Sequence, residues 1–476
     1  MTSEERLLPS KKGAAYVRTI RKLRPVAAAF GIAAIAISLN GCDALDQINL
    51  GDIVQVSRGE TTTQRDRSRN ASVSIADSER LKRIDDVLQA EVDAGRRAGF
   101  VAMVATSDAV AYSTAIGSAD IAGGRPMTVD TRFRIASMTK PVVSAAAMRL
   151  VEEGRLALND PVKMYIPAFA NPVVATDGMR GPDGTYPTRP AKRDILVRDL
   201  LTHTAGLGYA FLARTDLDKE YLAANPFFTE GDLDARIERI AALPLYFDPG
   251  ERWFYSYATD VLGRVVEVAS GMELGAYAKQ AIFDPLNMTD TFFLIDDADV
   301  PGLATVYTFD EAGNLTLPDP VDPNGQGIAV DINAQAFGVA SGGGGLVSTA
   351  PDYIRFCRML LNDGELDGAR ILSGASVRAM FTNQLLQRVL PQDWQDKGYG
   401  FGLGGQVIMK PGLTGEYDAP GDWRWGGYWD TSFVVNKADD VAVVLLTQRE
   451  PGPNDPGTNA GQLVRSIAYS AATGAE

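Results

Sequence analysis

The residues of this chain best suited to chemistry are a serine and a lysine three positions apart, Ser137 and Lys140. Positions i and i+3 of a helix share a face, so the hydroxyl and the amino group would lie side by side. A lysine withdrawn from water can accept the serine proton and activate the hydroxyl as a nucleophile. Pro141 suits a helix that begins just before Ser137, because proline is tolerated in a first turn. Taken alone, the tetrapeptide fits a capping serine and a solvated lysine better, so its context must decide.

Other catalytic groups are scarce. The 476 residues include one histidine, His203, and two cysteines, Cys42 and Cys357. Catalytic zinc needs three protein ligands, typically with several histidines, so a zinc hydrolase is disfavoured, whereas carboxylate sites for magnesium or calcium stay open. A Ser-His-Asp hydrolase would have to use His203, and the G-x-S-x-G segment of α/β-hydrolases is absent. Cys357 lies in a run with helical apolar spacing, which predicts a buried thiol.

Basic residues gather only at the N-terminus, where residues 1–24 hold seven lysines and arginines against two glutamates. The net charge is −14 and no basic block follows, so no nucleic-acid-binding surface is predicted. Residues 25–41 are uncharged and mostly apolar, as in a secretory signal, and are fewer than the roughly 20 residues that span a membrane. The run ends in Leu-Asn-Gly before Cys42, which resembles the lipoprotein box of bacteria.

These features predict a lipoprotein signal peptide over residues 1–41 and a lipid on Cys42. The lipid would anchor the protein to a membrane of the cell envelope, facing the periplasm or the exterior. A plain transmembrane anchor with an incidental cysteine is the alternative reading. Residues 42–78 are polar and predict a flexible tether, and residues 79–476 would form the folded domain.

Strand-like sequence lies at both ends of this domain, and mostly helical, loop-rich sequence lies between them. One sheet completed by both ends, with a helical second region, is therefore expected, in an α+β or α/β fold. The nucleophile would lie in the cleft between these regions, with Gly/Pro-rich insertions at Ala170–Pro190 and Pro318–Gly327 on its rim. The expected helices are one from Glu79, Ser137–Leu150 and Gly461–Ala472; the expected strands are Phe100–Thr106, Ala109–Ile116, Trp423–Tyr428, Thr431–Asn436 and Val441–Leu446.

Four sequence blocks, in a fixed order, resemble one enzyme superfamily. They are F-R-I-A-S-M-T-K (133–140), L-L-T-H-T-A-G-L (200–207), P-G-E-R-W-F-Y-S (249–256) and S-G-G-G-G-L-V-S-T (341–349). The chain from about residue 80 resembles the serine β-lactamases and penicillin-binding D,D-peptidases. It is most similar to the class C branch and to the β-lactamase-like family VIII carboxylesterases. The resemblance implies a β-lactamase-like fold: an antiparallel sheet flanked by helices.

The resemblance also implies roles for individual residues. Ser137 would be acylated, Lys140 would manage its proton, and Tyr255 would be the general base and acid. Trp425-Gly426-Gly427 resembles the third motif of the family, and the N–H groups of Ser137 and Tyr428 would then form the oxyanion hole. His203 lies in a block that the family does not use for catalysis. The alternative readings are a packed core aromatic for Tyr255 and an ordinary strand or turn for the two glycines.

Two departures from the family pattern bear on the substrate. Tyr257 replaces the asparagine that usually binds an amide side chain, and Trp425 replaces the lysine or histidine that helps to bind a substrate carboxylate. The neighbouring Arg424 would point to the other face of a strand. Both departures favour small uncharged esters, cleaved through an acyl-serine without metal or cofactor. The alternatives are a β-lactamase or D,D-peptidase, and an inactive penicillin-recognising binding protein.

Overall fold

The computed structural model describes the chain from residue 78 onward, apart from short gaps. The described residues are 78–209, 214–226, 229, 231–294, 299–320, 333 and 340–472. They fall within one of two units of the chain, Ser68–Glu476. The signal peptide, the lipid on Cys42 and the tether, except for its last residue, lie outside them and stay predictions. No helix among the described residues is both long and apolar enough to cross a bilayer.

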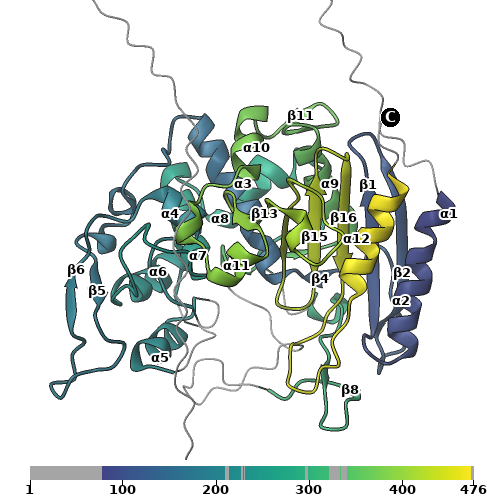
Figure 1. Ribbon diagram of the computed structural model, residues 1–476, viewed down its shortest axis with the longest axis horizontal. Helices are drawn as coiled ribbons and strands as arrows, with labels where there is room; N and C mark the ends of the chain where they lie inside the picture. Colours follow the sequence, from purple (N-terminus) through teal and green to yellow (C-terminus); the bar gives the residue numbers. More distant parts are fainter. Residues whose placement is uncertain are drawn as a thin grey trace, which may run out of the picture. The chain divides into compact units, whose positions relative to one another are not determined.

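An eight-stranded antiparallel sheet organises this unit, in the order β12-β13-β14-β15-β16-β1-β2-β3 (Figure 1). Its strands are β1 (Gly99–Ala105), β2 (Val110–Asp120), β3 (Arg125–Pro126), β12 (Tyr399–Phe401), β13 (Gln406–Ile408), β14 (Trp423–Gly426), β15 (Ser432–Asn436) and β16 (Val441–Leu446). Two-stranded ladders join β4 (Phe133–Arg134) to β9 (Val347–Ser348), β5 (Val173–Ala175) to β6 (Thr188–Pro190), β7 (Thr308–Phe309) to β8 (Leu315–Thr316) and β10 (Glu365–Leu366) to β11 (Ala369–Arg370).

Both ends of the domain complete this sheet, as predicted. Strand β1 pairs with β16 in a register that places Val101 opposite Leu446, and β1 also pairs with β2. The predicted strand Trp423–Tyr428 is shorter than expected, because the Gly427 N–H donates to the Thr431 carbonyl and so closes a turn after Gly426. The insertion Ala170–Pro190 contains the β5–β6 pair.

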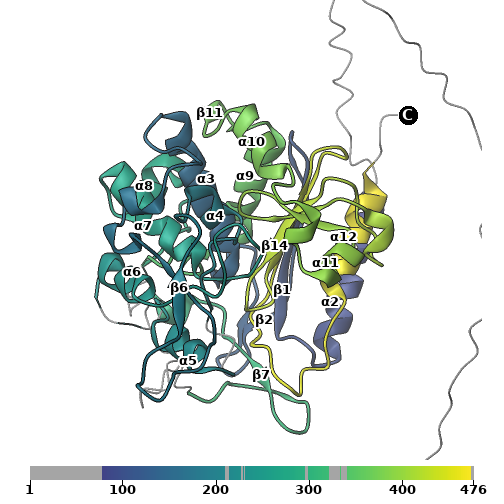
Figure 2. The ribbon, with the colours of Figure 1, turned by 60° about the vertical axis from the view of Figure 1, so that its left-hand side comes forward.

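Helices cover both faces of the sheet (Figures 1 and 2). The helices are α1 (Ser78–Leu81), α2 (Arg83–Asp93), α3 (Thr139–Glu152), α4 (Val197–Leu201), α5 (Asp216–Ala223), α6 (Leu233–Ala241), α7 (Ala258–Ser270), α8 (Leu274–Ala278), α9 (Ala350–Leu361), α10 (Gly374–Phe381), α11 (Gln392–Asp396) and α12 (Ala460–Ala471). Shorter helical turns are η1 (Ala136–Met138), η2 (Val162–Met164), η3 (Pro167–Phe169), η4 (Lys279–Phe283), η5 (Val300–Gly302), η6 (Gln387–Val389) and η7 (Pro411–Leu413).

One face of the sheet packs against the two helices nearest the ends of the domain. Ile84 and Leu88 of α2 and Val464 of α12 share a buried cluster with Phe100 and Ala102 of β1. The helix predicted from Glu79 is thus present, although it is divided into α1 and α2. Helix α9 packs on the other face, against β1, β15 and β16.

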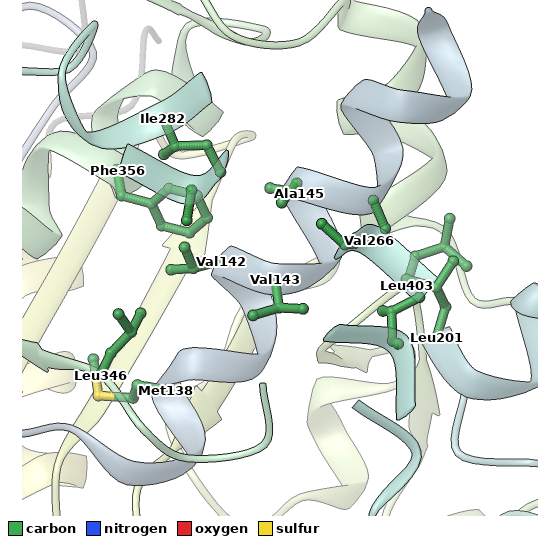
Figure 3. Close-up of a cluster of buried hydrophobic side chains, with 14 of the residues drawn as sticks. Met138, Val142, Val143, Ala145, Leu201, Val266, Ile282, Leu346, Phe356 and Leu403 are labelled. Atoms are coloured by element: carbon green, nitrogen blue, oxygen red, sulfur yellow. The ribbon is translucent and has the colours of Figure 1, made fainter. Parts of the chain in front are cut away.

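Helix α3 lies in the main core between α9 and the helical region. Figure 3 shows Val142 directed toward Phe356 of α9, with Leu201 of α4 and Val266 of α7 on the opposite side of the helix. Nearly every side chain of α3 is buried, so its position is set by packing on both sides. The helix predicted over Ser137–Leu150 is therefore present as the short turn η1, which holds Ser137, followed by α3, which holds Lys140 and runs to Glu152.

Candidate active site

The nucleophile candidate lies in a sharp turn between strand β4 and helix α3. Ala136 has a left-handed φ of +44°, which is strained for a residue with a Cβ atom, and it turns the chain into η1. The Ile135 N–H donates to the Leu346 carbonyl, which ties this turn to the chain entering β9. Ser137 is the one partly exposed residue between Phe133 and Lys140. The turn therefore presents the Ser137 hydroxyl at the surface of an otherwise buried segment.

Lys140 lies next to Ser137, as the spacing predicts. Its Nζ is 3.2 Å from Ser137 Oγ and donates to the Gly343 carbonyl at 2.6 Å. The same nitrogen lies 4.6 Å from the centre of the Tyr255 ring and 5.5 Å from that of Tyr209. The Lys140 side chain is 1% exposed, and removing such a group from water costs several kcal/mol. The carbonyl, the hydroxyl and the two aromatic rings offset this cost.

The position of Asp260, on α7, explains why the sequence block 341–349 contains a run of glycines. Its Oδ1 accepts hydrogen bonds from Ser341 Oγ at 2.6 Å and from the Gly343 N–H at 3.0 Å. A Cβ atom on Gly343 would lie 2.2 Å from Asp260 Oδ2, and one on Gly342 would lie 2.4 Å from the Thr259 carbonyl. Burial raises the pKa of Asp260, while the charge of Lys140 opposes that shift. The glycines thus let the loop lie against α7, with the Gly343 carbonyl directed at Lys140.

Tyr255 and Trp425 contact each other next to Lys140. The resemblance had assigned both residues to the site around Ser137. Trp425 Nε1 donates to the Tyr255 hydroxyl at 3.4 Å, and the ring centres are 5.4 Å apart. Trp253 and Trp394, with ring centres 4.3 Å apart, extend this aromatic surface. Arg424 lies on the opposite face of the sheet, as predicted, where it pairs with Asp418 at 2.8 Å.

Tyr209 is a site residue that the sequence reasoning missed. Its side chain is hydrogen-bonded to that of Ser137, and its ring lies 5.1 Å from that of Tyr255. Burial raises the pKa of Tyr209 well above its usual value, and the neighbouring Tyr255 and Asp260 act in the same direction. A hydroxyl held neutral in this way can orient Ser137 but is a poor proton acceptor. The available signal was its position, two residues after the block 200–207.

Tyr257 lies beneath Tyr209, away from the exposed surface of the site. It is 2% exposed, its ring centre is 4.7 Å from that of Tyr209, and its N–H donates to the Gly208 carbonyl. In this structure it therefore supports Tyr209 from behind. Its predicted contact with substrate stays a prediction.

His203 has a supporting position in the site. Its Nδ1 accepts a hydrogen bond from the Ser256 N–H at 3.3 Å, and its ring lies 4.8 Å from that of Tyr255. Burial lowers the pKa of His203 well below its usual value, and the charge of Lys140 lowers it further. The imidazole is therefore neutral near pH 7 and packs behind Tyr255.

The neutral state of His203 leads to a pH-dependent prediction. A histidine whose pKa is lower in the folded state binds fewer protons when folded, so stability falls as the pH drops below about 6.5, the value in the unfolded chain. His203→Asn keeps an acceptor for the Ser256 N–H and tolerates the positive φ of this position. Urea unfolding between pH 7.5 and 5.5 should show the wild type losing about 1 kcal/mol more per pH unit than the variant. Parallel pH profiles would contradict the neutral buried histidine.

The predicted third motif lies at the end of β14, against the nucleophile turn. A Cβ atom on Gly427 would be 2.4 Å from the Ile135 carbonyl, and Thr431 Oγ1 donates to the same carbonyl at 3.3 Å. Only glycine therefore allows this close approach. Tyr428 is the next residue and lies in the turn rather than on the strand, with its side chain exposed. Among the described residues, no cluster of histidine, cysteine, aspartate and glutamate could hold a metal ion.

Comparison with known proteins places this chain in a family. The beta-lactamase family model matches residues 84–466. Esterase EstB of Burkholderia gladioli is 34% identical over 77% of this chain and 89% of its own length. Lovastatin esterase of Penicillium rubens is 33% identical over 77% of this chain and 92% of its own length. The structure of EstCE1, described as a hydrolase with promiscuous acyltransferase activity, superposes with a TM-score of 0.69 at 30% identity and covers 83% of this chain and all of its own. The chain therefore belongs to the β-lactamase family and is a serine hydrolase of that family.

Proposed function

We propose that this chain hydrolyses small carboxylic esters through an acyl-serine intermediate on Ser137. The observation that carries the proposal is the 3.2 Å contact between Lys140 Nζ and Ser137 Oγ inside a buried setting of Tyr209 and Tyr255. A lone serine that caps a helix would leave its lysine in water. Here Lys140 is withdrawn from solvent and directed at the hydroxyl, as an activated nucleophile requires.

The proposed reaction has two halves. Tyr255, assisted by Lys140, accepts the Ser137 proton while Oγ attacks the ester carbonyl carbon, and Tyr209 holds the hydroxyl in place. The developing oxyanion lies between the N–H groups of Ser137 and Tyr428. The carbon–oxygen bond to the alcohol then breaks, and the alcohol leaves with the proton. Water attacks the acyl-serine in the second half, releasing the acid and restoring Ser137.

The side chains around Ser137 favour an uncharged ester over a β-lactam. Trp425 stands where the family pattern has a cation, and its N–H is directed at Tyr255. Arg424 is held on the other face of the sheet by Asp418, so it does not replace that cation. Trp253 and Trp394 add an aromatic surface suited to an apolar acyl or alcohol group. The esterase activity named for the relatives EstB and lovastatin esterase agrees with this choice.

A substrate comparison tests the proposal. Purified protein should cleave p-nitrophenyl butyrate with a kcat/KM about 10- to 100-fold higher than a chromogenic cephalosporin, because a charge-assisted bond to the substrate carboxylate is missing. Trp425→Lys returns a cation to this position and should shift the ratio toward the cephalosporin. A wild type that prefers the cephalosporin would overturn the ester assignment.

A further inference from the structure

The turn that joins β14 to β15 carries the second proposed oxyanion donor, so its position decides whether the site works. The Gly427 N–H donates to the Thr431 carbonyl at 2.7 Å, and the Asp430 N–H donates to the Gly427 carbonyl at 3.1 Å. These bonds close the turn around Tyr428. They do not attach the far side of the turn, at Trp429 and Asp430, to the rest of the fold. Thr431 Oγ1 fixes only the end nearest Ile135.

Asp430 makes the outer attachment through a buried arginine. Its Oδ2 accepts from Arg97 Nε at 2.8 Å and lies 2.7 Å from Arg97 Nη2. The Arg97 side chain is 1% exposed, whereas that of Asp430 is 30% exposed. Asp430 has a left-handed φ of +66°, which directs its carboxylate back toward the start of β1. Asp and Asn are the non-glycine residues that best tolerate this conformation.

A second arginine and a second aspartate complete the attachment. Arg449 Nη2 lies 3.5 Å from Asp430 Oδ2, and the Arg449 N–H donates to the Trp429 carbonyl in the same turn at 3.1 Å. Asp455 Oδ2 lies 2.7 Å from Arg449 Nη1, and its Oδ1 lies 3.5 Å from Arg97 Nη1. Two cations and two anions thus connect the turn with the segments before β1, after β16 and before α12. We call these four residues, Arg97, Asp430, Arg449 and Asp455, the charge network.

Such a network contributes more to geometry than to stability. Withdrawing an arginine from water offsets most of what its ion pairs gain, so buried pairs are weak evidence for stability. The bonds to Arg97 and Arg449 nevertheless attach the turn to the segments on both sides of it and so restrict where it can lie. An oxyanion donor needs such precision, because a displacement of about 1 Å can cost on the order of 100-fold in rate.

We propose that the charge network is a positioning device for the oxyanion hole, in which Arg97 and Asp430 hold the Tyr428 N–H at the reacting carbonyl. This inference rests on the proposed ester hydrolysis. It assigns a role to residues that do not touch the substrate. They act on the rate through the turn, and they make no contribution to substrate binding in the ground state.

Asp430→Asn tests this role with little change in shape. Asparagine keeps the size and tolerates the left-handed φ, but it removes the charge that holds Arg97. The expected result is a fall in kcat of about 10- to 100-fold with an unchanged KM for p-nitrophenyl butyrate. A boronic acid that forms a tetrahedral adduct with Ser137 should bind more weakly by the same factor.

The matched control is Asp440→Asn in the turn at the other end of β15. Asp440 also has a positive φ, +49°, and its carboxylate binds the Ser107 N–H at 2.9 Å, away from the site. This variant should keep the kcat and the boronate affinity of the wild type. Asp455→Asn should show a smaller effect than Asp430→Asn, because Asp455 holds the turn only through the two arginines.

The outcomes separate this inference from the proposed function. Variants are compared per active site, counted by the burst of p-nitrophenol, so that loss of folded protein does not imitate loss of rate. If Asp430→Asn melts at a lower temperature but keeps kcat and boronate affinity, the network is structural and the inference is wrong. If the wild type neither cleaves esters nor reacts with a fluorophosphonate, both the inference and the proposed function fail.

Discussion

Replacing Ser137 with alanine is expected to lower kcat/KM for p-nitrophenyl butyrate by about three orders of magnitude or more. The substitution removes the oxygen that would form the acyl-enzyme, while the oxyanion donors can still polarise a bound carbonyl. Stopped-flow and steady-state assays measure the rate, and a fluorophosphonate probe should label the wild type but not Ser137→Ala. Lys140 keeps its bond to the Gly343 carbonyl in this variant, so the fold around the site should persist.

Ser144→Ala is the matched control on the same helix. Ser144 is 1% exposed, and its Oγ has no hydrogen-bond partner among the described residues. Removing this hydroxyl should therefore leave kcat unchanged and should not lower the melting temperature. Equal losses in both variants would indicate a disturbed helix α3, and full activity of Ser137→Ala would disprove the nucleophile.

Removing the Tyr255 hydroxyl is expected to lower kcat by about 10²- to 10⁴-fold, the usual contribution of a general base. Tyr255→Phe keeps the ring against which Lys140, Trp425 and His203 pack. It removes the proposed proton acceptor and, with it, the long 3.4 Å hydrogen bond from Trp425 Nε1. The loss should appear in kcat and in the rate of acylation, measured by the burst of p-nitrophenol. Circular dichroism would show that the fold is kept.

Tyr209→Phe separates the two tyrosines. Burial holds the pKa of Tyr209 well above its usual value, so we expect its hydroxyl to orient Ser137 rather than to remove the proton of Ser137. Loss of one hydrogen bond of this kind predicts a decrease of about 10-fold. If Tyr209→Phe lowered kcat more than Tyr255→Phe, the roles assigned to the two tyrosines would have to be exchanged.

Local sequence patterns were sufficient to predict several of the longer helices and strands of the fold. Pro141 and the apolar spacing predicted a helix over Ser137–Leu150, which the structure has as η1 followed by α3. Runs rich in strand-forming residues predicted β1, β2, β15 and β16. A sheet completed by both ends was predicted because strand signals lay at both ends of the domain, and the pairing of β1 with β16 confirms it. Strands β12 and β13 were missed, since each has three residues and neither shows a period.

The site was predicted in its motifs but not in its three-dimensional contacts. Ser137, Lys140, Tyr255 and Trp425 come together from separate blocks, as the resemblance implied. Tyr209 went unnoticed because a tyrosine after a loop has no pattern that shows where its hydroxyl points. Asp260 was missed for a related reason: its carboxylate acts through backbone atoms of the glycine block, a contact that only the folded chain reveals.

The pairing of β1 with β16 also determines when activity can first appear during synthesis. Ser137, Lys140 and their helix emerge from the ribosome early, whereas the turn that carries Tyr428 and the edge of β16 emerge near the end. Val101 and Leu446 pair although they lie near opposite ends of the domain sequence, and bringing such distant segments together is a slow step in folding. A partly synthesised chain would therefore hold the proposed nucleophile without the proposed oxyanion donor at Tyr428, and we expect hydrolysis only after the C-terminal strands have joined the sheet.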